Sequence, residues 1–185
     1  MKEGQRVRST VVLLAMLLVS ANALPSWAES GAELERDSVN ALQKLVSGNT
    51  AAKLLETKAK AILVFPRIVK AGFMFGGQLG DGALLRNRRA IGFYNSLAGS
   101  YGLQAGVQVF GYALFFMNDE ALAYLDKSDG WEIGVGPSVV VVDKGMGKSM
   151  TSSTITQDIY AFIFDQKGLM AGLGIQGSKI TKISK

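Results

Sequence analysis

The sequence contains no cysteine and no histidine among its 185 residues. Without cysteine, the chain cannot form disulfides, thiolate metal sites or a cysteine nucleophile. Without histidine, it lacks the commonest metal ligand and the commonest general base, which excludes Ser-His-Asp and Cys-His catalysis. Proline is also scarce, at 3 residues against 22 glycines. That balance favours a β-rich chain with tight turns and close backbone packing.

Long apolar runs are few, and the clearest one lies near the N-terminus. Basic residues precede the run Val11–Val19, and Pro25 follows it. The run is shorter than the roughly 17–25 residues that cross a bilayer as a helix, so the pattern is that of a cleavable secretory signal. Small residues place the cleavage site after Ala23 or Ala28. We therefore expect a signal peptide over residues 1–28 and a single domain over residues 29–185.

The net charge and the expected export indicate which partners and which cellular compartment are compatible with the sequence. The net charge is +5, and residues 1–28 contribute three bases and one acid to it. The remaining +3 is too mild to indicate nucleic-acid binding. An exported chain without cysteine fits the periplasm or envelope of a bacterium better than a eukaryotic exterior, where small domains are rich in disulfides.

Helical patterns open the expected domain. Ser30 and Glu33 form a capping box ahead of apolar residues at helical spacing, and Ser47-Gly48-Asn49 ends that helix. A second helix starts with Thr50 as its cap and reaches about Ile62. Further on, Asn118 can cap a short helix over Asp119–Asp126.

The rest of the chain is rich in Val, Ile, Phe, Tyr and Gly, which predicts strands. The expected strands are Ile62–Phe65, Ala71–Leu79, Ala83–Arg86, Ala90–Asn95, Gly102–Met117, Trp131–Val142, Thr151–Phe164 and Leu169–Ile183. Turns are expected at Asp81-Gly82, in a loop at Asn87-Arg88-Arg89, and as a hairpin turn at Asp165–Gly168.

Two of the expected strands suggest how the layers pack. Ile159–Phe164 is apolar on both faces, as in a strand that is covered on both sides. Leu169–Gln176 has one face lined by glycine, which permits close approach or curvature. The predicted fold class is α+β, with N-terminal helices packed on an antiparallel β-sandwich or barrel-like sheet.

No motif supports catalysis or a cofactor. The segment ending in Gly147-Lys148-Ser149 resembles a phosphate loop, but Val142 stands where the loop needs glycine, and the residues that follow are not helical in pattern. We predict a flexible basic loop there. The acidic residues lie mostly at turns and caps, and no pair stands out as a general acid and base. The sequence predicts a protein that is not an enzyme.

A series of blocks resembles the SYLF domain family. They are Ala59–Pro66, Lys70–Gly77, Tyr101–Gln108, Ala113–Asn118, Gly134–Pro137, Asp158–Phe162 and Lys167–Leu173, in family order. The resemblance spans residues 30–183. It implies a lipid-binding or cytoskeletal adaptor module, because eukaryotic members bind phosphoinositides or, in fungi, bundle actin. A chain with an export signal and no second domain resembles the bacterial members, and binding of anionic phospholipid is the property that carries over.

The resemblance also suggests a binding site at Thr50–Lys70, where the family's amphipathic helix and bases lie. The expected lipid-binding residues are Lys53, Lys58, Lys60, Arg67 and Lys70, with Arg86, Arg88 and Arg89 as a second group. The expected mechanism is electrostatic docking with shallow insertion of the apolar run Ile62–Phe65. Two alternatives remain: a soluble periplasmic carrier of a hydrophobic ligand, and a small outer-membrane barrel.

Overall fold

A computed structural model describes residues 29–126, 130–133, 135–168 and 178–185. The expected signal peptide and most of the strand predicted at Leu169–Ile183, including its glycine-lined face, lie outside these ranges. The helices are α2 (Gly31–Gly48), α3 (Thr50–Glu56), α4 (Asp119–Ala123), a 3-10 turn η1 (Tyr124–Asp126) and α5 (Lys144–Ser149). The strands are β1 (Ala61–Arg86), β2 (Arg89–Phe116), β3 (Trp131–Glu132), β4 (Val139–Val141), β5 (Ile159–Gly168) and β6 (Lys179–Ile183).

The first two helices form where the sequence predicted them. The capping box of α2 is complete, with the Glu33 amide donating to Ser30 Oγ and the Ser30 amide donating to the Glu33 carboxylate. The cap of α3 is Asn49 rather than Thr50, because the Asn49 side chain accepts the Ala52 amide hydrogen at 3.0 Å. The second helix is also shorter than predicted, since it ends at Glu56 and strand β1 begins at Ala61.

Strands β1 and β2 form one long antiparallel hairpin, of 26 and 28 residues. The five strands predicted between Ile62 and Met117 are pieces of these two. Asn87 and Arg88 make the turn, with φ values of 51° and 59°, the left-handed pair that a two-residue hairpin needs. The turn predicted at Asp81-Gly82 is wrong, because both residues lie within β1 and pair with Asn95 and Tyr94.

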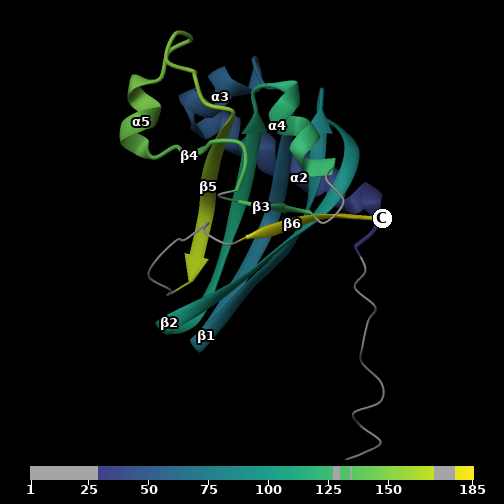
Figure 1. Ribbon diagram of the computed structural model, residues 1–185, viewed down its shortest axis with the longest axis vertical. Coiled ribbons are helices and arrows are strands. Elements are labelled where there is room, and N and C mark those ends of the chain that lie inside the picture. The colour runs from purple at the N-terminus through teal and green to yellow at the C-terminus, as the bar shows by residue number, and fades with distance from the viewer. Residues whose placement is uncertain (1–28, 127–129, 134, 169–177) are drawn as a thin grey trace, which may run out of the picture.

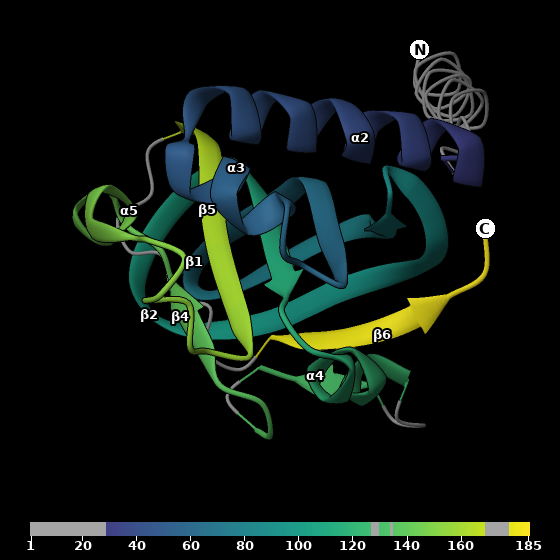
Figure 2. The same cartoon turned by 90° about the horizontal axis from the view of Figure 1, so that it is seen from above.

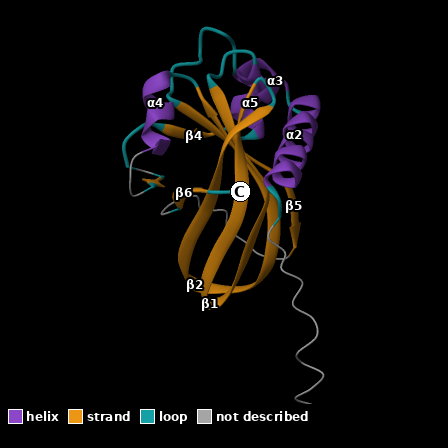
Figure 3. Cartoon of the chain, turned by 90° about the vertical axis from the view of Figure 1, so that its right-hand side faces the viewer, coloured by secondary structure: helices purple, strands orange, loops and turns teal. Residues whose placement is uncertain are grey.

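The hairpin curls so that the two halves of β1 meet. A Cβ added at Gly80 would lie 2.6 Å from the Arg67 carbonyl oxygen, and one at Gly82 would lie 2.5 Å from the Val64 carbonyl oxygen. Glycine is thus required at Gly82 for close backbone approach rather than for a turn. Figures 2 and 3 show the resulting curl, with α2 and α3 on one side of it and α4 on the other.

The remaining strands extend the sheet on both arms of β2. β6 pairs with the first arm and β5 with the second, both antiparallel, while β4 runs parallel to β5 at one edge and β3 pairs with β6 at the other. The α+β class with helices on a barrel-like sheet is confirmed, and the sheet is mixed because of the β4–β5 pair (Figure 1).

Several predicted elements are shorter or different. Only the ends of Trp131–Val142 are strands, and the strand predicted from Thr151 begins at Ile159. The hairpin turn predicted at Asp165–Gly168 is wrong, since these residues continue β5 through an irregularity opposite Val109 and Gly111. The positive φ values at Asp165 and Gly168 fit that irregularity.

Two hydrophobic clusters lie on opposite faces of the sheet. One contains Leu63, Phe65 and Tyr112 and is closed by residues of α4, η1 and β3. The other contains Val64, Phe115 and Phe162 and is covered by α2 and α3. Strand β5 contributes Ile159 and Ala161 to the first and Tyr160 and Phe162 to the second, as its two apolar faces predicted.

Candidate functional site

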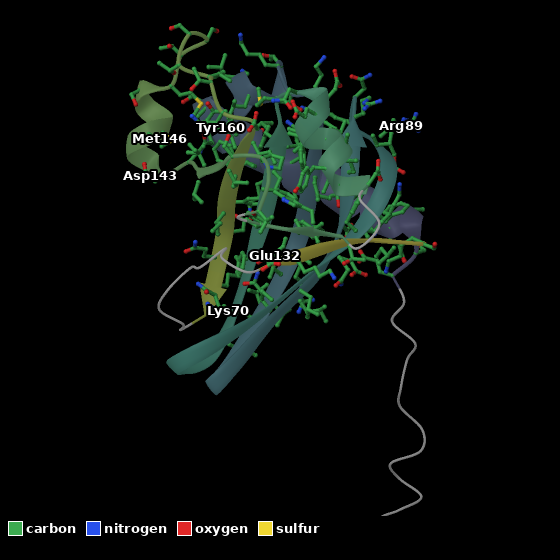
Figure 4. All side chains as sticks on the ribbon, viewed as in Figure 1. Lys70, Arg89, Glu132, Asp143, Met146 and Tyr160 are labelled. Atoms are coloured by element: carbon green, nitrogen blue, oxygen red, sulfur yellow. The ribbon has the colours of Figure 1, made fainter. Side chains whose placement is uncertain are left out.

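Six of the eight predicted lipid-binding residues lie around one end of the molecule. We name the group Lys53, Lys58, Lys60, Arg86, Arg88 and Arg89 the cationic surface. All six are exposed. The first three come from α3 and the turn after it, and the others flank the β1–β2 turn. Two segments far apart in the chain therefore form one basic region, which Figure 4 marks by Arg89.

Specific contacts hold these two segments together. Arg88 donates from Nε and Nη2 to Glu56 Oε1 at 3.0 and 2.9 Å, and from Nη1 to Gln43. Arg86 Nε donates to the Lys60 carbonyl oxygen at 3.3 Å. Lys60 Nζ lies 3.2 Å from Asp119 Oδ2. Arg88 and Lys60 thus have structural partners, and their charges are partly neutralised.

Three bases of the cationic surface have no partner for their side chains in the described part of the chain. The side chains of Lys53, Lys58 and Arg89 form no ion pair or hydrogen bond with any other residue that the structure describes. Their charge is available to a ligand, because no partner carboxylate or carbonyl has to be displaced. These three residues are the strongest candidates for contact with an anionic surface.

Arg67 and Lys70 lie elsewhere. Both belong to β1, and Figure 4 shows Lys70 well separated from Arg89 along the length of the molecule. Arg67 is exposed, but the Lys70 side chain is only 5% exposed. The prediction that Lys70 lies on the surface with the other bases is therefore wrong. Its side chain faces inward opposite Gln108, because the strand alternates and Lys70 falls on the inner face.

The predicted insertion segment is also wrong. Ile62, Leu63, Val64 and Phe65 are 6%, 0%, 0% and 0% exposed, so they cannot enter a bilayer without unfolding the core. They form the start of β1, with alternate side chains in the two hydrophobic clusters. The apolar run reflects burial on both faces of a strand.

One apolar residue beside the cationic surface was missed. Ile91 is 48% exposed and lies two residues from Arg89 on β2. It is left without a partner where Leu84 pairs with Gly92 and Leu85 with Ala90. This bulge turns an apolar residue outward, and alternation of residue types alone does not reveal a bulge.

The segment that resembles a phosphate loop is a short helix, α5, so the prediction of a flexible loop is wrong. Asp143 caps it, accepting the Met146 amide hydrogen at 2.8 Å. The Asp143 carboxylate thus already satisfies an N-terminal amide of α5. An open groove of about 660 Å³ lies next to it, lined by Leu45, Val142, Phe162, Phe164 and others, with the Lys44–Asp165 ion pair of 2.6 Å among the lining residues.

The carboxylates of the described residues serve mainly structural roles. Asp158 accepts from Asn118 Nδ2 at 2.8 Å and from both the amide and the hydroxyl of Ser138 at 2.9 Å. These hydrogen bonds, the Ser138 amide first, lower the pKa of Asp158. Asp81 binds Asn95 and Lys185. Within the described ranges, no group of three acidic side chains could hold a metal ion.

The structure defines an α+β domain in which helices cover a curled sheet. Residues 97–185 match the family model Ysc84, described as a Las17-binding protein actin regulator. This family is also called SYLF, and over these residues the match confirms the resemblance that the sequence predicted. The family is linked to actin and lipid binding. No curated protein matches the chain. Across the described residues, every helix is too short or too polar to cross a bilayer.

Proposed function

We propose that this protein binds anionic phospholipid at the bacterial envelope, weakly and without catalysis. The observation that supports this is the cationic surface, where Lys53, Lys58 and Arg89 are exposed and lack partners among the described residues. The match of residues 97–185 to a family linked to lipid binding supports the same ligand class. The basic and apolar pattern of residues 1–28 supports export to the envelope.

The geometry favours contact through charge. A base near an anionic membrane surface contributes about 1 kcal/mol, so a few bases give reversible binding rather than permanent anchoring. Ile91 adds one exposed apolar side chain beside Arg89. Since the Debye length falls from about 10 Å at 0.1 M salt to about 3 Å at 1 M, the binding is expected to weaken sharply with salt.

Vesicle co-sedimentation tests the proposal. The full chain is compared on phosphatidylglycerol and phosphatidylcholine vesicles at low and high salt. The test variant carries Lys53→Gln, Lys58→Gln and Arg89→Gln. The control carries Arg36→Gln, Lys44→Gln and Lys182→Gln, which removes the same charge from bases that already have carboxylate partners.

We expect binding to phosphatidylglycerol alone, lost at high salt, and reduced more than tenfold in the test variant. The control is expected to bind within about twofold of the unmodified chain. Equal losses in both variants would mean that net charge, rather than the cationic surface, determines binding. No binding to either vesicle would contradict the proposed function.

A further inference from the structure

The middle parts of β1 and β2, which form the end of the curl, reverse the usual burial pattern. We name residues 69–80 of β1 and 96–109 of β2 the distal hairpin. The polar side chains that it turns inward are buried: Lys70 is 5% exposed, Gln78 8%, Ser96 0% and Gln108 5%. Among the described residues, Ser96 Oγ and Gln108 Oε1 have no hydrogen-bond partner. An ordinary protein core satisfies such groups.

The outward side chains that the structure describes in the distal hairpin are apolar. Leu79 and Leu97 are directly paired across the strands and are 55% and 56% exposed. Val107 is 57% exposed and pairs with Ala71, which is also exposed. We name Ala71, Leu79, Leu97 and Val107 the apolar band. Because the two halves of β1 lie against each other at Gly80, the band follows the outside of the curl.

The helical layer ends before it reaches this band. Phe93 and Phe115, on the two arms of β2, pack into the cluster that α2 and α3 cover. Beyond them, at Leu97 on one arm and Val107 on the other, the outward side chains are more than half exposed. Figures 1 and 3 show β1 and β2 continuing past the helices toward the end of the curl.

Bases border the apolar band on both sides. Lys179 of β6 is the cross-strand partner of Leu97, and Lys167 of β5 is the partner of Val109, two residues from Val107. Arg67 lies on β1 nearby. All three bases are exposed, and none of their side chains forms an ion pair or hydrogen bond with another described residue. Apart from the exposed Glu132, which is the partner of Lys179 on β3, this border is basic and complements a negatively charged surface.

Polar side chains inside, apolar side chains outside and bases at the border are what a lipid-facing β-structure requires. The same combination of exposed aliphatic groups and lysines suits the boundary between headgroups and acyl chains. We propose that the apolar band inserts shallowly into an anionic bilayer, with Arg67, Lys167 and Lys179 at the lipid phosphates. This inference rests on the proposal that the protein binds anionic lipid, but it places the apolar contact away from the cationic surface.

A single fluorescent label tests the insertion, since the chain has no cysteine of its own. Leu97→Cys and, as a matched control, Thr151→Cys on an exposed loop are labelled with the environment-sensitive dye NBD in the full chain. On phosphatidylglycerol vesicles, we expect the label at position 97 to brighten at least twofold and shift to the blue, and the label at 151 to stay unchanged. Vesicle binding without a change at position 97 would overturn the inference and leave the proposed function standing.

Exposed apolar substitutions give a second test. The band variant carries Leu79→Ser, Leu97→Ser and Val107→Ser. Its control carries Val135→Ser, Val141→Ser and Met146→Ser, which are exposed to a similar degree elsewhere. Since none of these side chains is buried, both variants are expected to fold. We expect the band variant to lose about tenfold in binding to phosphatidylglycerol vesicles and the control less than twofold.

The remaining outcomes distinguish insertion of the apolar band from two alternatives, which are lipid binding without the band and a second copy of the chain on the band. A band variant that binds vesicles like the control would overturn it. So would a dimer of the unmodified chain, detected by analytical ultracentrifugation, that the band variant abolishes while vesicle binding is kept, because a second copy would then be the occupant of the band. Loss of binding in the band variant alone, with none in the Lys53, Lys58 and Arg89 variant, would support the band and contradict the cationic surface.

Discussion

The β1–β2 hairpin has two parts, the strand ends that helices cover and the distal hairpin. They are made of similar residues but are built for different surroundings. Where β1 begins, side chains on both faces are buried and apolar, as Val64 and Phe65 show at 0% exposed. In the distal hairpin, Gln108 is buried while Val107 beside it is more than half exposed. The difference lies in what covers each half: α2 and α3 cover the first, and no described element covers the apolar band.

This comparison shows that apolar content alone does not identify a lipid-binding segment. Ile62–Phe65 is the more hydrophobic run, yet it is a core strand. The exposed apolar residues Leu79, Leu97 and Val107 are scattered among glycines and polar residues in the sequence. Only their pairing in the sheet places them on one surface.

The largest difference between the halves is expected for loss of a large side chain. Phe115 is fully buried and packs edge-to-face on Phe162, with ring centroids 5.2 Å apart. Phe115→Ala is expected to lower the free energy of unfolding by about 3–5 kcal/mol. Leu97→Ala, on the same strand, is expected to change it by less than about 0.5 kcal/mol, because the side chain is exposed. Urea denaturation measures both, and similar losses would contradict the comparison.

A smaller effect is expected at glycines. A Cβ at Gly82 would meet the Val64 carbonyl oxygen at 2.5 Å, whereas one at Gly99 would meet no atom within 4 Å. Gly82→Ala is expected to destabilise the protein by about 1–3 kcal/mol, since backbone has to move. Gly99→Ala in the distal hairpin is expected to be neutral. Thermal unfolding distinguishes them, and a neutral Gly82→Ala would mean that the two halves of β1 are not in close contact.

Two tyrosines allow a buried hydroxyl without a described hydrogen-bond partner to be compared with one that has a partner. Tyr112 OH is buried without a hydrogen-bond partner among the described residues, and burial raises its pKa. Tyr94 OH donates to Asp126 Oδ1 at 3.2 Å. Removing an unpaired hydroxyl is expected to be neutral or to stabilise by about 1 kcal/mol, while removing a paired one costs about 0.5–1.5 kcal/mol. Tyr112→Phe and Tyr94→Phe should therefore differ in sign in urea denaturation, and equal losses would show that Tyr112 has a partner.

The smallest expected effect is the contribution of Asp158 to the pH dependence of the free energy of unfolding. Hydrogen bonds from Ser138 and Asn118 lower the pKa of Asp158 below its value in the unfolded chain. The stabilisation is therefore present above the unfolded pKa, near 4, and is lost as pH falls through the lower, folded pKa. Asp158→Asn is expected to be less stable than the unmodified chain at pH 7 and to lose less stability between pH 5 and pH 2. Parallel stability curves for the two proteins would contradict this role.

Local signals in the sequence predicted much of the fold. The Ser30–Glu33 box, the Asn118 cap and the two apolar faces of Ile159–Phe164 act through neighbours in the chain or through burial of a whole segment, and each is confirmed. The Asp81-Gly82 turn was wrong because Gly82 is required by Val64, eighteen positions away. Close packing between distant segments leaves no local pattern.

The candidate site was predictable only in part. The bases were visible, and the structure brings six of them together, but the Arg88–Glu56 and Arg86–Lys60 contacts depend on how the hairpin curls. Lys70 reads like the other bases, yet it lies on the inner face. Outward and inward positions alternate along a strand, so the bulge between Phe65 and Ile68 decides on which side the later residues of β1 fall.

Amide hydrogen exchange of the full chain, with and without phosphatidylglycerol vesicles, tests the comparison most directly. It reports on both halves of the hairpin in one experiment. We predict that lipid slows exchange in residues 76–80, 96–99 and 106–109, and leaves residues 61–65 and 113–116 unchanged because the core already protects them. Vesicle binding with no added protection in the distal hairpin would contradict the claim that its apolar face is built for lipid.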